Sequence, residues 1–369
     1  MSEAIHGSGG EAMIRLDRLT KSYPGRPEPA VHELTLDVPA GRIVAFVGPS
    51  GCGKTTTMKL INRLIEPTAG RIHLGGTDVT EVRADRLRRK IGYTIQQTGL
   101  FPHRTVASNI ATVPRMLGWD AGSIAERVDE LLNLVGLDPQ HYRGRYPKQL
   151  SGGQQQRVGV ARSLGADPAV MLMDEPFGAI DPLNREALQN ELLRIQAQLR
   201  KTIVFVTHDI DEAIKMGDRI AIFRDGGRIA QYDVPERILG EPADDFVREF
   251  LGSGTAVKRL SLTRLADLDI PRWPTVDDSA EDAERVAVAT RTDEEFLLLL
   301  DSERRPLGWQ PRNRPDDRDA AVPLISPLGP RHTLFEALDQ MLSVNSSASV
   351  VVDEQGRSRG VLRSTPSGS

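Results

Sequence analysis

The stretch Gly48-Pro49-Ser50-Gly51-Cys52-Gly53-Lys54-Thr55 decides the fold of this 369-residue chain. It matches the pattern G-x-x-x-x-G-K-[ST] and follows Ile43–Val47, an apolar segment with the length of a buried strand. A helix is predicted after it, ending before Pro67, because apolar residues recur at helical spacing at Met58, Ile61, Leu64 and Ile65. The sequence therefore predicts a strand, a glycine-rich loop and a helix in direct succession.

A loop of this kind is typical of phosphate binding. Its glycines let the backbone curl so that N–H groups point at phosphate oxygens, and the following helix adds the positive end of its dipole. We expect Lys54 to reach the terminal phosphates of a nucleotide and the Thr55 hydroxyl to hold Mg²⁺. Cys52 is interpreted as a small residue tolerated in this loop, with a redox-active thiol as the alternative.

A second apolar segment, Val170–Met173, ends in two carboxylates, Asp174 and Glu175. Open α/β sheets bind their ligands at the carboxyl ends of strands, where these two side chains are expected. We expect Asp174 to hold Mg²⁺ through water and Glu175 to polarise the attacking water.

Three further features are candidates for the same chemistry. Ser151-Gly152-Gly153-Gln154 opens a predicted helix that runs to Leu164, so its hydroxyl and free N–H groups predict a second anion site. Gln96 ends the predicted strand Ile91–Ile95, and His208 ends the predicted strand Ile203–Thr207. Both side chains are expected at the carboxyl edge of the sheet, where the imidazole can hydrogen-bond a γ-phosphate.

The pattern of elements predicts two folded parts. Strands alternating with helices over residues 12–250 indicate an α/β architecture with a largely parallel sheet. Pro39-Ala40-Gly41 between Leu34–Val38 and Ile43–Val47 predicts a hairpin. Residues 1–11 are expected to form a flexible tail, and the small residues from Leu251 to Gly254 open a linker expected over residues 251–260.

Composition narrows the function classes. The chain has 47 basic and 51 acidic residues and a net charge of −4, which disfavours a mainly electrostatic nucleic-acid binder. No apolar run approaches the roughly 18–20 residues of a membrane-spanning helix, and the N-terminus lacks the pattern of a secretory signal. The single cysteine fits a reducing cytosol.

Residues 261–369 contain an internal repeat with an offset of 52 residues. Leu298–Asp301 with Gly308 matches Val350–Asp353 with Gly360, and Ile270-Pro271 matches Val322-Pro323. Each copy, at about 261–312 and 313–364, predicts an extended segment, a helix, a strand, a turn and a strand. Two such copies are expected to pair into one small α+β domain, with a chance echo as the alternative.

In this order, the motifs of residues 12–250 resemble those of the ATP-binding subunits of ABC transporters. The resemblance implies a P-loop nucleotide-binding domain with a mostly parallel sheet, additional antiparallel strands and a helical subdomain. It also implies ATP hydrolysis with Mg²⁺ in a head-to-tail homodimer, in which two ATP molecules lie between one subunit's phosphate loop and the other's signature.

The resemblance also assigns residue roles. Glu175, His208 and Gln96 are catalytic, Thr55, Gln96 and Asp174 serve the metal, and Asp181 lines the dimer interface. The signature that contacts the partner's ATP is Ser151, Gly152, Gly153 and Gln154. ATP binding falls to Tyr23, which stacks on adenine, and to Gly48, Pro49, Ser50, Gly51, Cys52, Gly53, Lys54, Thr55 and Thr56.

Two features resemble the branch that imports glycine betaine, choline, carnitine and proline. One is the segment Ile91–His103, in which Leu100 and Phe101 follow Gln96 where importers receive a permease helix, with a local loop anchor as the alternative. The other is the C-terminal repeat, which resembles a tandem CBS module. Nucleotide-binding CBS repeats carry an Asp for the ribose, and neither copy supplies one. A structural or dimerising role of the repeat is the alternative to ligand binding.

The resemblance implies a motor on the cytoplasmic face of a membrane, peripherally bound to two transmembrane permease subunits that work with an extracytoplasmic solute-binding protein. Nucleic acid is not an expected partner. Two alternatives stay open: an importer ATPase for another small solute such as an amino acid, and a soluble ABC ATPase acting on nucleic acid or ribosomes. The second is disfavoured because the chain has one cassette and no heptad run.

Overall fold

The computed structural model describes residues 12–94, 99–178 and 180–364, apart from the side chains of residues 182–184. The chain forms two compact units, Met1–Gly252 and Ser253–Ser369.

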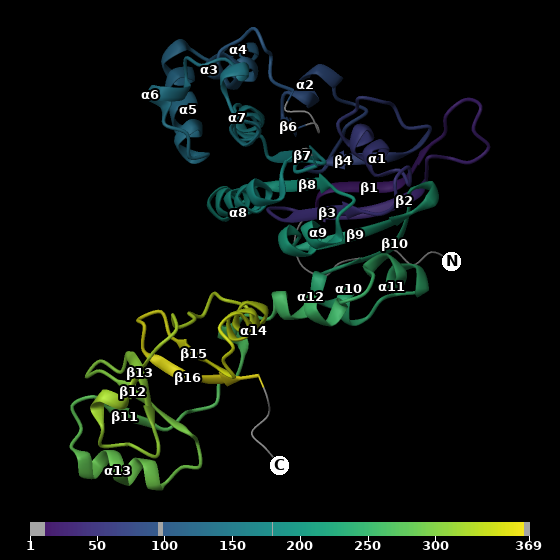
Figure 1. The fold of residues 1–369 in the computed structure, drawn as a ribbon. Helices are drawn as coiled ribbons and strands as arrows, with labels where there is room; N and C mark the ends of the chain where they lie inside the picture. Colours follow the sequence, from purple (N-terminus) through teal and green to yellow (C-terminus); the bar gives the residue numbers. More distant parts are fainter. Residues whose placement is uncertain (1–11, 95–98, 179, 365–369) are drawn as a thin grey trace. The chain divides into compact units, whose positions relative to one another are not determined.

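A six-stranded sheet forms the centre of the N-terminal unit, in the order β10-β9-β3-β8-β7-β6 (Figure 1). Its neighbouring strands run parallel except for β10, which is antiparallel to β9. All residues of β3 and β8 are buried, as expected for strands covered on both faces. The strands are β3 (Ile43–Val47), β6 (Ile91–Thr94), β7 (Val170–Asp174), β8 (Thr202–Val206), β9 (Arg219–Arg224) and β10 (Arg228–Asp233).

A second, antiparallel sheet has the order β2-β1-β4-β5. It consists of β1 (Ala12–Lys21), β2 (Val31–Pro39), β4 (Ala69–Leu74) and β5 (Thr77–Asp78). Ile14, Leu16 and Leu36 of this sheet share one core with Val44 and Phe46 of the parallel sheet.

The predicted hairpin at Pro39-Ala40-Gly41 is wrong. Strand β2 pairs with β1, whereas β3 pairs with β8 and β9 in the other sheet. The turn therefore carries the chain from one sheet to the next, because the same turn chemistry serves a change of layer as well as a hairpin.

Helices α3–α7 form a group at one side of the two sheets (Figure 1). They are α3 (Val106–Ile110), α4 (Thr112–Met116), α5 (Ala121–Leu134), α6 (Pro139–Tyr142) and α7 (Gly152–Leu164). The other helices of this unit are α1 (Lys54–Ile61), α2 (Ala84–Arg88), α8 (Pro182–Leu199), α9 (Ile210–Met216), α10 (Pro235–Gly240) and α11 (Asp245–Leu251).

Helix α1 ends earlier than its apolar pattern predicts. Arg63 has a left-handed backbone, φ 49°, and its N–H donates to Leu60 O while Leu64 N–H donates to Lys59 O. This pair of bonds satisfies the last carbonyls of a helix and stops it. Leu64 consequently lies outside the helix with 43% of its surface exposed.

In the C-terminal unit the elements of the two repeats occur at the same spacing. Helices α13 (Asp282–Thr290) and α14 (Leu334–Ser343) begin 52 residues apart, as do β12 (Phe296–Leu300) and β15 (Ala348–Val352). The same holds for β13 (Pro306–Pro311) and β16 (Ser358–Arg363). Strands β11 (Thr275–Asp277) and β14 (Val322–Pro323) complete the sheet β11-β12-β13-β14.

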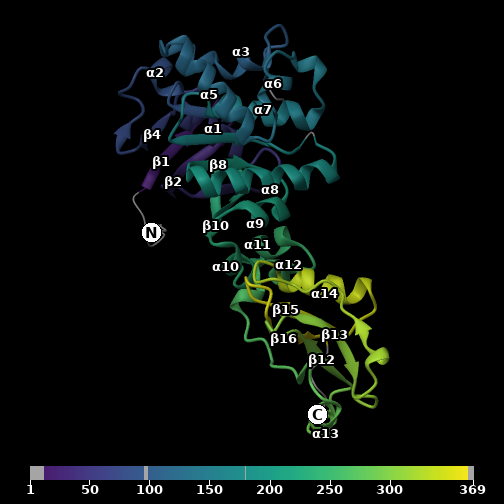
Figure 2. The same cartoon turned by 90° about the vertical axis from the view of Figure 1, so that its left-hand side faces the viewer.

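The two copies form one core and exchange their leading segments. Leu298 and Leu300 of the first copy pack in one cluster with Val350 and Val352 of the second. The segment before the second copy, Val322-Pro323, pairs with β13 of the first. Conversely, Pro271 O from the first copy accepts a hydrogen bond of 3.1 Å from Val361 N in β16. Helices α13 and α14 lie at opposite ends of the unit, with the strands between them (Figures 1 and 2).

The expected linker at residues 251–260 is largely helical. Gly252 and Gly254 have positive φ values of 71° and 84°, and α12 (Thr255–Leu262) begins directly after them. The compact C-terminal unit includes α12, which packs against α14, and therefore begins before residue 261.

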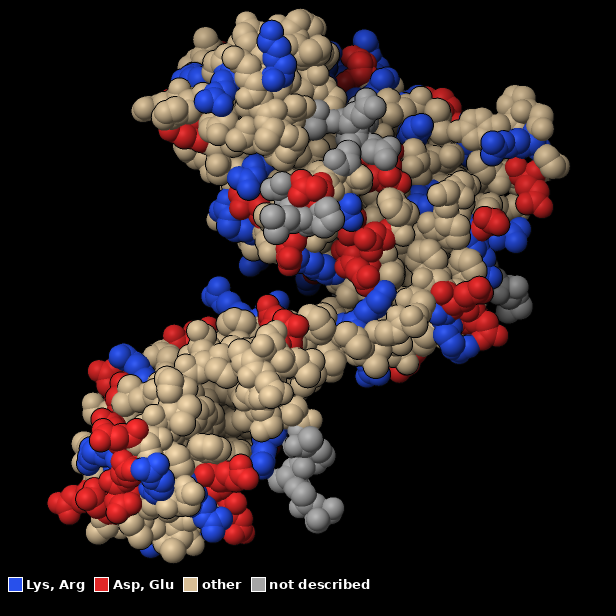
Figure 3. Space-filling model, in the orientation of Figure 1, with Lys and Arg blue, Asp and Glu red and all other residues tan. Residues whose placement is uncertain are grey.

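Within residues 12–94, 99–178 and 180–364, no helix combines the length and the apolar character needed to cross a bilayer. Acidic and basic side chains are interspersed on the face of the molecule seen in Figure 3.

Candidate functional site

The glycine-rich loop turns sharply between β3 and α1. Gly48 has φ 147°, and a Cβ atom on it would lie 2.3 Å from Phe223 O on the neighbouring strand β9. Only glycine fits this close approach of two backbones. The loop is therefore anchored on the sheet, and the start of α1 is fixed beside it.

Lys54 places its ammonium group inside the loop. Its Nζ donates to Gly48 O at 2.7 Å and to Pro49 O at 2.9 Å, and only 6% of the residue's surface is exposed. Phosphate oxygens can replace the carbonyl oxygens as acceptors of this buried ammonium group, because charge-assisted hydrogen bonds to phosphate are stronger than those to neutral carbonyls.

Cys52 is fully buried in the same loop. Burial raises the pKa of its thiol, and the nearby Lys54 ammonium lowers it to a smaller extent. A raised pKa keeps the thiol protonated and unreactive, which favours the structural interpretation of Cys52 over a redox role.

Thr55 and Asp174 join the loop to the acidic strand. The Thr55 hydroxyl donates to Asp174 Oδ1 at 3.0 Å, so α1 and the end of β7 are in direct contact. Burial raises the pKa of Asp174, while the Thr55 hydrogen bond lowers it. A hydroxyl and a carboxylate side by side, next to a phosphate-binding loop, fit Mg²⁺, which takes one or two protein oxygens together with substrate phosphates.

Glu175 lies next to His208. The Glu175 backbone has a left-handed φ of 45°, and its N–H donates to Val206 O at 3.0 Å. The structure brings Glu175 Oε1 within 3.5 Å of His208 Nδ1. A carboxylate and an imidazole from two neighbouring strand ends thus meet at the carboxyl edge of the sheet, and the unusual backbone of Glu175 is consistent with a strained functional position.

The signature residues form the N-terminus of α7. Ser151 is the N-cap: its Oγ accepts from Gln154 N at 3.3 Å, and Gln154 Oε1 accepts from Ser151 N at 3.0 Å. Gln154 also donates from Nε2 to the Tyr142 hydroxyl at 3.1 Å. Its side chain is therefore used in capping, and the exposed Ser151, Gly152 and half-exposed Gly153 present the free helix end. In Figure 1 this helix belongs to the helical group, whereas the loop of residues 48–55 lies at α1.

The remaining predicted residues are more scattered. Tyr23 follows β1, with Lys21 Nζ 5.2 Å from the centroid of its half-buried ring. Thr56 is half-buried on α1, and the exposed Asp181 precedes α8. Gln96 lies outside the described residues, so its predicted role stays a prediction.

Sequence reasoning missed three side chains beside His208. The Thr207 hydroxyl donates to Glu212 Oε2 at 2.7 Å, and Arg185 Nε lies 3.8 Å from Glu212 Oε1. Glu212 is buried. The only sequence signal was a carboxylate one helical turn after His208, which is common on surface helices.

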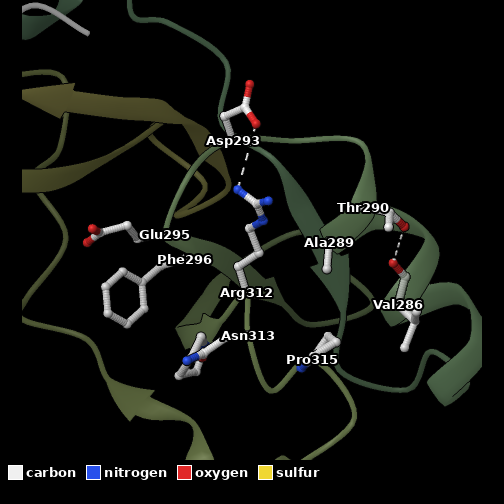
Figure 4. Close-up of a pocket in the computed structure, with 10 residues that line it drawn as sticks. Val286, Ala289, Thr290, Asp293, Glu295, Phe296, Arg312, Asn313 and Pro315 are labelled. Atoms are coloured by element: carbon white, nitrogen blue, oxygen red, sulfur yellow. Dashed lines mark hydrogen bonds and ion pairs between the residues drawn. The ribbon is translucent and has the colours of Figure 1, made fainter. Parts of the chain in front are cut away.

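A hollow of about 670 Å³ beside α13 in the C-terminal unit lacks a comparable arrangement (Figure 4). Asp293 and Arg312 on its lining pair with each other at 3.7 Å. The Thr290 hydroxyl donates to Val286 O at 2.6 Å. These polar groups bond to one another or to the backbone, and the wall also includes the apolar Phe296.

Comparisons with known proteins show which family the chain is similar to. The family model "ABC transporter" matches residues 31–178. The osmoprotectant import ATP-binding protein OsmV of Salmonella typhimurium is 44% identical over 360 residues, covering 95% of this chain and 94% of that protein. The glycine betaine/carnitine/choline transport ATP-binding protein OpuCA of Bacillus subtilis is 54% identical over 240 residues, covering 65% of this chain and 62% of that protein.

Among solved structures, the chain is similar to the dimeric structure of a post-hydrolysis state of the ATP-binding cassette MJ0796 bound to ADP and Pi. The identity is 32% and the TM-score 0.54, over 60% of this chain and 99% of that chain. A phosphate loop joined to an acidic strand, together with a relative matched over nearly its whole length, leads to one conclusion: the chain belongs to the family of ABC transporter ATP-binding proteins.

Proposed function

We propose that the chain is the ATP-hydrolysing motor subunit of an importer for a small osmoprotectant such as glycine betaine, choline, carnitine or proline. The contact between Thr55 and Asp174 carries the ATPase part, because it joins the phosphate loop to the acidic strand at one edge of the sheet. The cargo class is supported by the relatives OsmV and OpuCA, whose names give osmoprotectant import and glycine betaine/carnitine/choline transport.

In this proposal the residues divide the work of phosphoryl transfer. Residues Gly48 to Thr56 bind the phosphates through backbone N–H groups and Lys54, and Tyr23 stacks on adenine. Mg²⁺, held by Thr55 and Asp174 together with Gln96, would neutralise charge on the phosphates. Glu175 accepts a proton from the attacking water and orients it, and His208 hydrogen-bonds the γ-phosphate.

The proposed active unit is a head-to-tail homodimer. Ser151, Gly152, Gly153 and Gln154 would complete the site of the partner subunit, and Asp181 would line the interface. The free N-terminus of α7 supports this arrangement, because exposed N–H groups at a helix end favour an anion. The similar cassette MJ0796 is dimeric in its ADP- and Pi-bound structure.

We place the dimer peripherally on the cytoplasmic face of the membrane, docked on two permease subunits that receive cargo from an extracytoplasmic solute-binding protein. Leu100 and Phe101 are the candidate contacts. The Phe101 ring has the Arg104 and Arg162 guanidinium carbons 4.6 Å and 4.8 Å from its centroid, and Phe101 N–H donates to Asn109 Oδ1 at 2.8 Å. These contacts support a rigid loop at the start of the helical group.

The C-terminal unit is proposed to be a degenerate tandem CBS-like domain that regulates or dimerises and does no chemistry. The spacing of its elements and the exchange of leading segments support a paired module. The lack of a ribose-binding Asp in either copy argues against a strong adenosine ligand.

The function is tested by deleting this chain and measuring uptake of labelled glycine betaine, choline, carnitine and proline at high osmolarity. Loss of uptake of at least one of them, restored by the wild-type chain and not by Glu175→Gln, is expected. Normal uptake of all four together with loss of uptake of an amino acid such as histidine would instead identify the competing cargo class.

A further inference from the structure

His208 lies between two residues that the fold holds in place. Thr207, which is buried, follows β8; its N–H donates to Phe46 O at 3.1 Å, tying it to β3. The Thr207 hydroxyl accepts from Asp209 N at 3.0 Å and donates to Glu212 Oε2 at 2.7 Å. The residue before His208 thus supplies a hydroxyl that accepts from the backbone N–H of the residue after it, and that hydroxyl donates to one carboxylate.

The buried position of Glu212 is unfavourable for a carboxyl group. Only 6% of its surface is exposed, and burial raises the pKa of its carboxyl while the Thr207 hydrogen bond lowers it. A buried carboxyl group without partners destabilises a fold. A neutral acceptor would serve the Thr207 hydroxyl equally well. The negative charge of Glu212 is therefore explained by the other contact of its carboxylate.

That contact is Arg185 on α8. Its Nε lies 3.8 Å from Glu212 Oε1, and its Nη1 lies 3.9 Å from Asp209 Oδ2. A third nitrogen of the same guanidinium, Nη2, donates to Ile180 O at 3.3 Å. Ile180 directly precedes Asp181 in the chain.

We propose that Glu212 and Arg185 are positioning residues that link the loop of His208 to the loop of Asp181. Glu212 holds the Thr207 hydroxyl on one side and the Arg185 guanidinium on the other, and Arg185 holds the carbonyl next to Asp181. The planar guanidinium suits this role, because Nη2 can donate to Ile180 O while Nε and Nη1 face the carboxylates of Glu212 and Asp209 as ion pairs, without hydrogen bonds to them. A displacement of the Asp181 loop is therefore transmitted to the imidazole that faces Glu175.

This inference rests on the proposed function, since it assigns His208 to the γ-phosphate and Asp181 to the dimer interface. It adds that the two are coupled within one subunit. Closure of the dimer at Asp181 then sets the orientation of His208, so that hydrolysis in one subunit depends on the position of the other.

The test measures ATP hydrolysis by the full-length chain carrying Glu212→Gln. The amide oxygen still accepts the Thr207 hydrogen bond, but the attraction of Arg185 is lost. We expect kcat to fall about tenfold and KM for ATP to stay within about twofold, because the phosphate grip lies in the loop of residues 48–55. Lys215→Gln is the matched control: it also removes a charge that links α9 to α8, at the exposed pair with Glu186 3.2 Å away, and kcat should stay unchanged.

A double-mutant cycle with His208→Ala separates positioning from general stability. If Glu212 acts through His208, adding Glu212→Gln to His208→Ala should change kcat by no more than about twofold. Effects that multiply, or a wild-type kcat in Glu212→Gln, would overturn the inference while leaving the proposed function intact. A wild-type kcat in His208→Ala would overturn the proposed role of His208 and the inference with it.

Arg185→Gln is the second variant, for use if Glu212→Gln does not fold, because the Arg185 side chain is less deeply buried. It is expected to give the same loss of kcat and the same lack of additivity with His208→Ala. Arg185→Lys keeps the charge that attracts Glu212 but not the planar group that also donates to Ile180 O, so partial recovery of kcat is expected. Full activity of Arg185→Gln would contradict the proposed link.

Discussion

Gly48 in the N-terminal unit and Gly360 in the C-terminal unit have nearly the same backbone. Their φ values are 147° and 150°, and a Cβ atom would lie 2.3 Å from Phe223 O in the first case and 2.2 Å from Pro271 O in the second. Both positions exclude a side chain for the same steric reason. The difference between the two regions lies in the groups that the close approach brings together.

Around Gly48, charged side chains converge. The Lys54 ammonium comes from one point of the chain and the consecutive Asp174 and Glu175 carboxylates from another, and the two points lie together at one sheet edge. Burial raises the pKa of Asp174, which means that the charged carboxylate is less stable in this position than in water. Such an arrangement costs stability and is expected where the groups act on a ligand.

Around Gly360, the close approach joins backbones inside an apolar core. Ile270 Cγ2 would lie 3.0 Å from the same Cβ atom, and Leu298 and Val350 belong to one apolar cluster of this unit. The charged residues of the strand ends serve their own turns: Asp353 Oδ1 accepts from Gln355 N at 2.9 Å and Arg357 N at 2.8 Å, and Asp301 does the same in the first copy. The same steric device therefore builds a site in one unit and a symmetric core in the other.

Among the substitutions that test this difference between the two units, Glu175→Gln is expected to have the largest effect on ATP hydrolysis. The substitution removes the proposed proton acceptor and leaves the phosphate loop untouched, so hydrolysis should fall by about 100-fold or more. ATP binding should persist, and the protein should accumulate as an ATP-dependent dimer on gel filtration. Turnover within about threefold of wild type would rule out Glu175 as the general base.

Lys54→Ala should act on binding itself. The side chain is the cation inside the loop, and a charge-assisted hydrogen bond contributes about 1.5–3 kcal/mol, which corresponds to roughly 10–150-fold in Kd for ATP. Calorimetric titration of the full chain measures it, with Lys59→Ala as a control on the exposed face of the same helix. An unchanged affinity in Lys54→Ala would refute the assignment.

The sequence predicted the parts of this site that depend on local patterns. The loop of residues 48–55 and the acidic end of β7 were predicted from short motifs, because a glycine-rich turn and a buried strand each leave a signal within a few residues. Thr55 and Asp174 were each assigned to Mg²⁺, whereas their direct contact at 3.0 Å was not itself predicted.

The parts that were missed depend on long-range contacts or on ambiguous turns. Arg185 and Glu212 meet through two helices, and neither residue type marks a site by itself. The turn at residues 39–41 changes sheets instead of forming a hairpin, since local chemistry does not specify a strand's partner. Helix α1 is terminated by the left-handed Arg63 just after its C-cap, a position where glycine is the usual signal.

A paired substitution tests the two glycines directly. Gly48→Ala and Gly360→Ala introduce the same clash, at a cost of about 1–3 kcal/mol each. The first should abolish ATP binding. The second should lower the melting transition of the C-terminal unit, reported by the fluorescence of Trp273 and Trp309, and leave ATP hydrolysis unchanged. Gly356→Ala, with φ 80° and open space around it, is the control for strain without a clash. Loss of hydrolysis in Gly360→Ala would break the proposed separation of roles.

The smallest effect is expected from removing the C-terminal unit altogether. The motif residues assigned to binding and hydrolysis end at His208, and the chain divides into compact units after Gly252. A chain ending at Gly252 should therefore remain soluble and hydrolyse ATP within about twofold of the full-length rate. What should change is the response of transport to ionic strength or to a small ligand, because a module without chemistry acts through the rest of the assembly.

Calorimetric titration of the full chain and of the shortened chain with AMP and cyclic dinucleotides provides the second half of the test. Equal heats in the two are expected, since neither repeat supplies a ribose-binding Asp; micromolar binding to the full chain alone would show that the repeat has kept a ligand site by other residues. Loss of hydrolysis in the shortened chain would mean that the apolar pairing of the repeats supports the catalytic unit.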